Sequence, residues 1–592
     1  VVVLLKIGEG KIFPSFYDFS LKIASYLSRR GACCHGKIEN RTFVMKRLIL
    51  ILSLVPALFG AESDPAVRKY YNEKAQIRMR NFEMPEDVTI RLWADESQTQ
   101  NPSAITFDSQ GRLYVAEINR WRFGVDDIRE RRMMLVEDLK IQSNADRLKM
   151  FENHYAEFPP EHYTNKADQI SVLEDTDGDG RADVSKIFAG GFNDPLDGPG
   201  IGLIERDGKI YYTNIPHLWM LEDTDGDGVS DKRTSLQDGF GIRMSFSGHD
   251  MHGLTWGPDG KLYWSLGDRG YSLVTKEGKR FHGPNKGAVF RCDPDGSNVE
   301  LFYDSLRNPQ ELTWDDYGNL FTADNDADGV DLERINYLVE GGESGWHAGY
   351  QSIMSFTKDL DLRSSKYTSD SKLPLGWITE YMWKVRHEDQ PAFMLPGVGQ
   401  IIGGPSGFVF NPSNAMGEKY DDKFFVIIYK GSLTHSYISM FNLEDDGASF
   451  NLVNDEVFFR GSNCVDIDFG PDGKLYMSDY NYGGWLNQDV GNIYSMEVPG
   501  EIEKKDVADN EVILLSDLSK LSIAELSKLL GREHQQVRLK CQFELAKRGA
   551  AGVGAFTRAA VNGGNSTFTR IHGVWGLGQM AGDQGIGILD PL

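Results

Sequence analysis

The chain has 592 residues and a formal net charge of −24, with 40% hydrophobic and 25% charged residues. This length is enough for more than one domain, and the composition is ordinary for a protein with a packed core. The acidic surplus argues against a nucleic-acid-binding surface, because phosphates would be repelled. We therefore expect no nucleic-acid partner.

The N-terminal region is predicted to be absent from the mature protein. Residues 1–44 begin with Val and are expected to be non-native upstream translation, with the true start at Met45. Residues 45–61 join a short basic segment to a brief apolar run and small residues, which is typical of a secretory signal peptide. A buried N-terminal helix is the alternative. We expect export to the periplasm or cell envelope and no membrane span in the mature chain.

Cysteine supplies neither a disulfide framework nor a haem attachment site. Cys292, Cys464 and Cys541 are widely spaced. Cys33 and Cys34 precede His35 directly and lack the Cys-x-x-Cys-His spacing. We therefore expect no haem on this chain.

A short phrase recurs along the chain and predicts the fold. In its clearest copy, Gly257-Pro-Asp-Gly260 separates two alternating, aromatic-rich runs, which is the pattern of a β-hairpin. Copies cover residues 107–114, 205–211, 257–263, 315–321, 410–425 and 470–476. A second hairpin follows several of them, at residues 171–180, 219–228, 289–296 and 438–447. Two hairpins per repeat predict an all-β six-bladed propeller, with a β-sandwich array as the alternative.

The propeller is expected over residues 87–500, with residues 62–86 as an N-terminal segment. Residues 88–93 are predicted to begin the first blade. A charged, helix-prone insertion over residues 118–168 is expected to cover one face as a lid or a wall. After Pro499 the alternation stops, and paired amphipathic helices over residues 513–592 predict HEAT-like repeats that are truncated. A small helical cap is the alternative.

Two acidic loops share one spacing and predict calcium binding. Carboxylates at alternate positions, with glycine where the loop turns, can wrap a hard cation in oxygen ligands. Lys186 and Thr234 replace the closing Glu of an EF-hand, so calcium would stabilise a hairpin; a plain acidic turn is the alternative. The predicted ligands are Asp175, Asp177, Asp179 and Asp183, then Asp223, Asp225, Asp227 and Asp231, and, in a looser loop on the active face, Asp324, Asp326 and Asp328.

Two further clusters carry candidate chemistry. His249 lies where a loop enters a strand and can act as a general base, although a structural histidine is the alternative. Arg307, Asn308 and Gln310 precede another strand and can grip a planar, anionic group by paired hydrogen bonds. A surface loop with local turns is the alternative there.

The segment Arg307-Asn308-Pro309-Gln310, followed by Glu311-Leu-Thr-Trp, resembles a motif of the soluble quinoprotein glucose and sorbosone dehydrogenases, and Gly345-Trp346 matches the same family. These are six-bladed propellers that bind pyrroloquinoline quinone (PQQ) and calcium. The resemblance implies that His249 is the catalytic base and that Arg307 stabilises charge on the reduced quinone. It implies cofactor contacts from Arg307, Asn308 and Gln310.

Residues 324–329, 339–351 and 469–479 are also similar to the secreted "membrane-bound dehydrogenase" proteins of planctomycetes and verrucomicrobia. In that family the propeller precedes HEAT-like repeats and a cytochrome c domain. We therefore expect an enzyme that oxidises a sugar or alcohol and passes electrons to a cytochrome c domain or protein.

The alternative function is a non-catalytic, calcium-stabilised propeller that binds carbohydrate or a protein partner. It rests on four positions at which the quinoprotein family has Asp, Lys and two arginines. This chain has Gly248, Thr434, Asn463 and Val465 there.

Overall fold

The computed structural model describes residues 65–325, 332–356 and 395–584. The predicted leader, the predicted signal peptide, and Asp326 and Asp328 lie outside these residues. The chain divides into residues 1–60 and 61–592, and the second unit holds everything described below. In the described ranges, no helix is both long enough and apolar enough to cross a bilayer.

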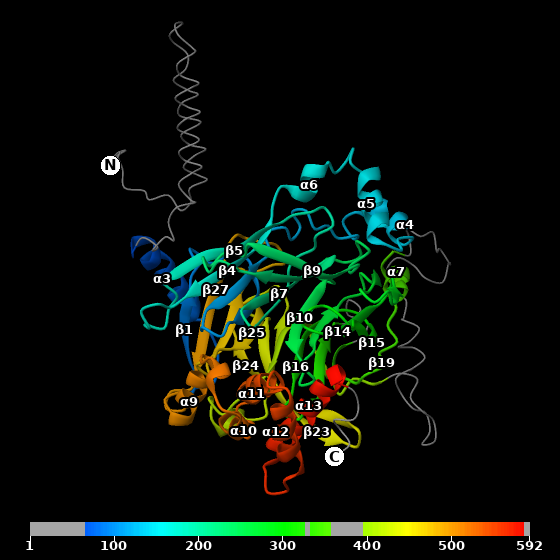
Figure 1. The fold of residues 1–592 in the computed structure, drawn as a ribbon. Helices are drawn as coiled ribbons and strands as arrows, with labels where there is room; N and C mark the ends of the chain where they lie inside the picture. Colours follow the sequence, from blue (N-terminus) through cyan, green and yellow to red (C-terminus); the bar gives the residue numbers. More distant parts are fainter. Residues whose placement is uncertain (1–64, 326–331, 357–394, 585–592) are drawn as a thin grey trace. The chain divides into compact units, whose positions relative to one another are not determined.

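Six antiparallel sheets form the body of this unit and confirm the predicted six-bladed propeller (Figure 1). In each blade the inner strand contacts the inner strands of its two neighbours, so that the six inner strands close a ring. Blades one to three contain β2 (Pro102–Phe107), β3 (Leu113–Glu117), β4 (Asp168–Glu174) and β5 (Val184–Phe192); β6 (Gly202–Arg206), β7 (Lys209–Asn214), β8 (His217–Glu222) and β9 (Lys232–Asp238); and β10 (Met251–Trp256), β11 (Leu262–Leu266), β14 (Gly287–Cys292) and β15 (Glu300–Leu306).

The third blade has a fifth strand, β19 (Gly342–Glu343), which pairs parallel with β15. Between β11 and β14 the chain forms a separate hairpin of β12 (Tyr271–Val274) and β13 (Arg280–Gly283). Blades four and five contain β16 (Pro309–Trp314), β17 (Leu320–Asp324), β18 (Glu333–Leu338) and β20 (Gly399–Ile401); and β21 (Gly404–Phe410), β22 (Phe424–Tyr429), β23 (Tyr437–Asp446) and β24 (Ser449–Arg460).

The sixth blade is completed by the N-terminal strand of the propeller. It contains β25 (Cys464–Phe469), β26 (Leu475–Asp479), β27 (Asn492–Glu497) and β1 (Thr89–Ala94). Strand β1 pairs antiparallel with β27, from Thr89 opposite Glu497 onward. The prediction that residues 88–93 begin the first blade was therefore wrong, because a propeller closes its ring by sharing one blade between its two ends.

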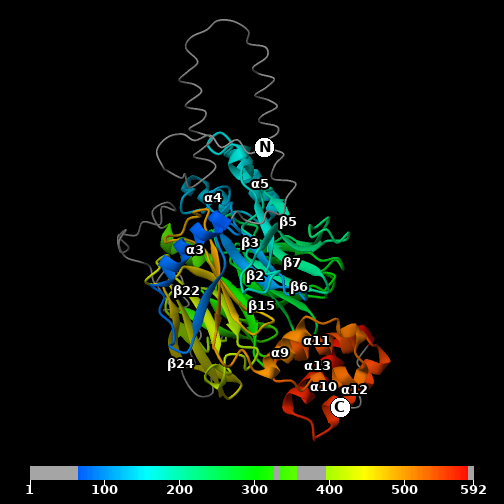
Figure 2. The same cartoon turned by 90° about the vertical axis from the view of Figure 1, so that its left-hand side faces the viewer.

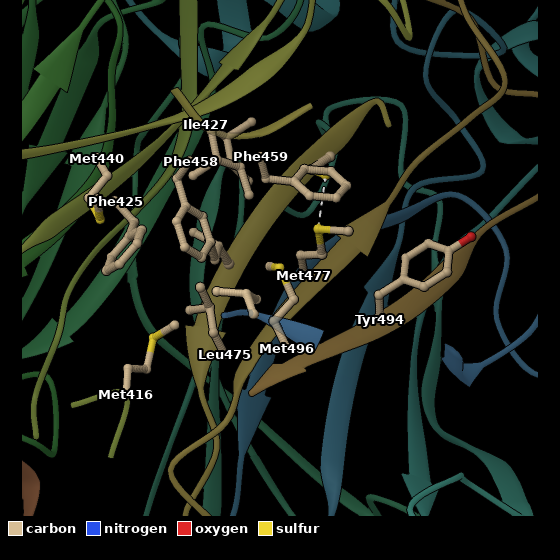
Figure 3. Packing of buried hydrophobic residues seen from close by; sticks show 14 of the residues in the cluster. Met416, Phe425, Ile427, Met440, Phe458, Phe459, Leu475, Met477, Tyr494 and Met496 are labelled. Atoms are coloured by element: carbon tan, nitrogen blue, oxygen red, sulfur yellow. Dashed lines mark hydrogen bonds between the residues drawn. The ribbon is translucent and has the colours of Figure 1, made fainter. Parts of the chain in front are cut away.

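Each copy of the recurring phrase joins the two inner strands of one blade. In blade three the turn between β10 and β11 places Gly260 at φ +82°, a conformation that glycine adopts without strain. Large apolar side chains then fill the space between blades. Figure 3 shows one such cluster, in which Phe425, Phe458 and Phe459 pack with Met477 and Tyr494 between blades five and six.

The insertion forms short helices with a core of their own. They are η1 (Arg132–Met134), α4 (Leu135–Asp138), α5 (Asn144–Asn153) and α6 (Pro160–Thr164). Met134, Met150 and Phe151 pack against Met244 and Phe246, which lie ahead of β10. The insertion is therefore a fixed wall above the start of β10.

Helices follow the propeller and pack against its hairpin turns (Figure 2). The Gln542 side chain donates to the Pro258 carbonyl over 2.6 Å, and Arg538 pairs with Asp316. These helices are α9 (Lys505–Leu514), η3 (Leu518–Lys520), α10 (Ile523–Leu529), α11 (Gln535–Ala546), α12 (Ala550–Val561) and α13 (Thr567–Gln584). The assignment of this tail as HEAT-like repeats stays a prediction. The remaining helical segments of the described chain are α3 (Pro65–Met79), α7 (Ala348–Ser355) and η2 (Glu418–Tyr420).

Candidate functional site

The site lies at the end of the inner strands that is opposite the tail helices. His249 precedes β10, and Arg307 and Asn308 precede β16. Since the Gly turns end these strands at the tail face, residues that begin them gather at the other face, below the insertion.

A cavity of about 590 Å³ brings most of the predicted residues together. This volume lies within the usual range for small-molecule sites. Its lining includes the predicted residues His249, Arg307, Asn308 and Gln310, and also Trp121, Arg122, Arg129, Glu130, Gly248, His252, Glu333, Val465 and Trp485.

His249 is fixed by a buried carboxylate. Its Nδ1 lies 2.7 Å from Asp268 Oδ1, while Trp346 Nε1 donates to Asp268 Oδ2 over 2.8 Å. Within the described residues, Nε2 of His249 has no hydrogen-bond partner, and the side chain lines the cavity. An imidazole held in this way presents one basic nitrogen to a ligand.

The two acidic neighbours of His249 in the sequence have different roles. Burial alone would raise the pKa of Asp268, but the charge of His249, its hydrogen bond, and the nearby Arg307 hold that pKa below its ordinary value. Asp250 instead pairs with Arg269 and accepts a hydrogen bond from the Gly248 amide. Asp268 therefore stays ionised and is the partner of the candidate base.

His252 is a structural histidine. Its Nε2 donates to the Gly248 carbonyl over 3.0 Å, and burial lowers its pKa to about 4. A neutral imidazole with this bond supports the turn that carries His249.

Asp324 holds the start of β16. Its carboxylate accepts from the backbone N–H of Asn308 at 2.8 Å and of Arg307 at 3.2 Å, and from Arg334 Nη2 at 2.9 Å. The carboxylate that was predicted as a calcium ligand therefore accepts hydrogen bonds from these three donors. The structure thus gives Asp324 a positioning role for the Arg307–Asn308 pair.

The Arg307 and Asn308 side chains face the cavity from fixed positions. Arg307 Nε donates to Gln351 Oε1 over 2.8 Å, and its guanidinium lies 5.7 Å from the Trp346 ring centroid. Asn308 Oδ1 and His252 Nδ1 are both buried without a hydrogen-bond partner in the described part of the chain, and the Asn308 side chain acts on the pKa of His252. The Asn308 amide therefore lies beside His252 and also lines the cavity.

The two acidic loops lie elsewhere, at the tail-side end of the outer strands. In each loop, carboxylate oxygens of three aspartates lie within 4.8 Å of one another: Asp175, Asp177 and Asp179, and Asp223, Asp225 and Asp227. The fourth predicted ligand of each loop accepts a hydrogen bond from a threonine hydroxyl. Asp183 accepts from Thr176 Oγ1, and Asp231 accepts from Thr224 Oγ1, each over 2.6 Å. These loops do not contribute to the cavity.

The insertion supplies residues that the sequence analysis did not single out. Gly248 has φ +90°, and a Cβ there would lie 2.9 Å from Trp121 Cη2, so the missing side chain makes room for the Trp121 ring. Arg122 and Arg129 add two guanidinium groups to the wall. The signal available in the sequence was the concentration of arginine and tryptophan at the start of the insertion.

Two of the departures from the quinoprotein motif lie away from the cavity lining. Asn463 is buried, with its amide committed to Asn481 and its carbonyl to Ser436. Thr434 bonds Ser432 on the surface, whereas Val465 lines the cavity and adds an apolar surface.

Comparison with known proteins gives structural neighbours and one family. No curated protein matches the chain. A putative oxidoreductase (glucose dehydrogenase) from Thermus thermophilus is similar, with 15% identity, a TM-score of 0.41, and coverage of 69% of this chain and 99% of that chain. The PQQ-bound aldose sugar dehydrogenase of Streptomyces coelicolor has 13% identity and a TM-score of 0.40, over 70% and 99% of the two chains. The PQQ domain of the Coprinopsis cinerea pyranose dehydrogenase has 11% identity and a TM-score of 0.39, over 70% and 97%.

A family model matches residues 74–486, which is well over half of the chain. The chain belongs to the family described as "Domain of unknown function (DUF7133)".

Proposed function

We propose that the protein is a glucose/sorbosone-dehydrogenase-like oxidoreductase, which oxidises a hydroxyl group of a sugar or alcohol with PQQ as cofactor. The observation that carries this proposal is the His249–Asp268 pair. It presents an imidazole Nε2 to a cavity whose wall contains Arg307 and Asn308.

The residues of the cavity fit an anionic, planar cofactor. Three guanidinium groups, those of Arg122, Arg129 and Arg307, line the cavity; Arg122 pairs with Glu130, and Arg129 pairs with the buried Asp127. Guanidinium groups bind carboxylates and quinone oxygens by paired hydrogen bonds. Arg307, Asn308 and Gln310 would hold the quinone end, and the arginines of the insertion would replace the cations that the motif lacks.

The chemistry of these residues is proton transfer and charge stabilisation. When bound, the quinone supplies the acceptor for a hydride, which leaves the hydroxyl-bearing carbon with both electrons of its C–H bond. His249 Nε2 takes the hydroxyl proton as the carbonyl forms. Asp268 stabilises the resulting imidazolium, and the Arg307 guanidinium would stabilise negative charge that develops in the cavity.

Four further proposals complete the functional assignment. Calcium binds the two acidic loops, because each gathers three carboxylates of the spacing that hard cations prefer. The protein is exported through the signal peptide that begins at Met45, and its helical tail forms HEAT-like repeats. Electrons pass from the cofactor to a cytochrome c domain or protein.

The experiment is a titration of PQQ, with calcium present, into the protein, followed by reduction of an artificial dye with a panel of sugars and alcohols. We expect saturable binding and a dye reduction that His249→Ala lowers at least about a hundredfold. His282→Ala is the matched control, because His282 is an exposed residue of β13 outside the cavity lining. Absence of PQQ binding at tens of micromolar would contradict the proposal.

The second candidate is a propeller that only binds carbohydrate or a protein. Val465 favours it, because an apolar residue lines the cavity where the quinoprotein motif has a cation. Saccharide binding without any dye reduction dependent on His249 would support this candidate over the enzyme.

A further inference from the structure

We propose that a second cavity, on the propeller axis beside the tail helices, binds an aliphatic polyamine through its ammonium groups. This cavity has a volume of about 720 Å³, which lies within the usual range for small-molecule sites. Its lining includes residues of all six inner strands and of the tail, and none of them lines the cavity that contains His249. The proposal goes beyond the proposed oxidoreductase activity and does not depend on it.

Three carboxylates line this cavity from two of the inner strands. Glu311 belongs to β16, and Asp466 and Asp468 are alternate residues of β25, so these two lie on one side of that strand. Burial raises the pKa of each carboxyl group, and repulsion between the charges adds to this effect for Glu311 and Asp466. A positive charge among them would stabilise their ionised forms.

In the described chain, no lysine or arginine neutralises these three carboxylates. Gly253 N–H donates to Glu311 Oε1 over 3.3 Å, and Phe469 N–H donates to Asp468 Oδ1 over 2.8 Å. Both oxygens of Asp466 also accept from backbone amides. Buried carboxylates are normally paired with a cation. This group therefore lacks a counter-charge that a ligand can supply.

The positively charged residues deeper in the lining have other partners. The Arg206 guanidinium lies over the rings of Trp256 and Phe543, 4.5 and 4.0 Å from their centroids. Lys540 Nζ donates to the Ser516 carbonyl over 3.0 Å. Neither side chain lowers the pKa of the three carboxyl groups.

A buried hydroxyl in the same lining also has no partner. Thr106 of β2 is only 5% exposed and lines the cavity. Within the residues that the structure describes, its Oγ1 takes part in no hydrogen bond. A buried polar group without a partner is costly, so an ammonium group that donates to Oγ1 would stabilise the complex.

The lining favours an organic ammonium over a metal ion. In the described ranges, the sets of three ligand atoms within 4.8 Å of one another are those of the two acidic hairpins, so the axial carboxylates form no compact metal cage. The lining also includes the apolar residues Leu254, Leu312, Trp314 and Phe408. A polyamine suits both features, because its ammonium groups can donate to separate carboxylates while its methylene segments contact apolar surface.

The cavity reaches solvent at one edge. Lys547 Nζ lies 2.6 Å from Asp207 Oδ1, and both residues line the cavity. Their side chains are 47% and 55% exposed. The cavity is therefore accessible from solution beside this pair.

The test is calorimetric titration of spermidine into the full chain without PQQ, at about 0.15 M salt to screen binding to the acidic surface. We expect saturable binding at one site and no binding of triethylene glycol, an uncharged chain. Asp468→Asn and Glu311→Gln should each weaken spermidine binding at least about tenfold. The double variant Asp445→Asn with Asp446→Asn is the matched control, because both residues are exposed at the end of β23 and lie outside the lining.

Thr106→Val removes the hydroxyl with little change in shape and should weaken binding roughly threefold. It tests the site even if a carboxylate variant fails to fold. Spermidine affinity that is equal in the parent and in all the cavity variants that fold would overturn the proposal. So would an equal loss of affinity in the control, which would indicate binding to the acidic surface. Calcium binding that depends on Asp468, without spermidine binding, would replace the polyamine by a metal ion.

Discussion

At the scale of single residues, the site depends on a buried hydrogen-bond chain. Trp346 and His249 bind the two oxygens of Asp268 at 2.8 and 2.7 Å, so the carboxylate cannot rotate and the imidazole cannot change its orientation. A partner of this kind fixes the ring orientation of a histidine and selects one tautomer.

The first prediction concerns Asp268→Asn. The amide keeps the shape but removes the charge that stabilises the imidazolium, so we expect kcat to fall about tenfold to a hundredfold, with KM changed much less. The pH at which the reaction is half-maximal should also move, which a purely structural defect would not cause. Steady-state dye reduction across pH measures both effects, with Asp207→Asn on the tail face as control. An unchanged pH profile would contradict the role of Asp268.

At the scale of elements, the two acidic hairpins are the parts whose stability should depend on a cation. Three carboxylates close together repel one another, and a divalent ion removes this repulsion. Because the hairpins are the outer halves of blades one and two, their loss would expose the side of each blade.

We therefore expect removal of calcium with a chelator to lower the melting temperature, and calcium to restore it. The double variant Asp177→Asn with Asp225→Asn should melt at the chelated temperature and no longer respond to calcium. Differential scanning calorimetry measures this, with magnesium as the control ion. An identical melting temperature with and without chelator would argue for plain acidic turns.

The tail helices contain a histidine that must stay neutral. Arg538 Nε donates to His572 Nε2 over 3.1 Å, so Nδ1 donates to Gln542, and burial next to this arginine lowers the pKa of His572 to about 3. In the unfolded chain the pKa is about 6.5, so the unfolded state binds a proton first as the pH falls. This contribution to stability is present above about pH 6.5 and is lost as the pH falls toward 3.

The prediction is that the free energy of unfolding falls between pH 6.5 and 4, and that His572→Gln makes this fall shallower. Glutamine retains a hydrogen-bonding group but has no proton to gain in this range. Urea unfolding at a series of pH values checks it, with the exposed His282→Gln as control. An equal slope in His572→Gln and the parent protein would show that other groups dominate.

At the scale of the whole molecule, the ring is closed by β1. Leu92 of this strand is 3% exposed and packs in the cluster between blades five and six, whereas the side chain of its neighbour Arg91 is 64% exposed. The strand therefore adds buried apolar surface as well as backbone hydrogen bonds to the last blade.

We expect Leu92→Ala to reduce the free energy of unfolding by about 2–5 kcal/mol, because it leaves a cavity at the closure. Arg91→Ala, on the opposite face of the same strand, should change it by less than about 1 kcal/mol. Urea unfolding at neutral pH compares the two. If Leu92→Ala costs no more than Arg91→Ala, the closure contributes little to stability.

Much of the fold could be predicted from the sequence because it is repetitive. A Gly turn between alternating runs specifies a hairpin locally, and six copies specify six blades. The pairing of β1 with β27 could not be predicted in this way, because it joins segments about 400 residues apart and no local pattern records it.

The candidate site was predictable where it lies on the repeats. His249, Arg307, Asn308 and Gln310 begin inner strands, and the ring of blades brings such positions to one face. The pairing of Asp268 with His249 could also have been predicted, because the end of β11 lies opposite the start of β10. Trp121 and the insertion arginines could not be placed, because an irregular segment finds its position only through tertiary packing.

The pairing of β1 with β27 also has a consequence for the order in which the protein is made. Among the strands that the structure describes, β1 leaves the ribosome first and β27 leaves it last. Until residue 497 has been synthesised, β1 lacks its partner strand, and its unpaired edge can join other strands. A nascent chain that stops before Asn492 therefore has most of its blades, but its ring stays open and its unpaired strand edges can associate with other chains. Only the last few residues of the propeller close the ring.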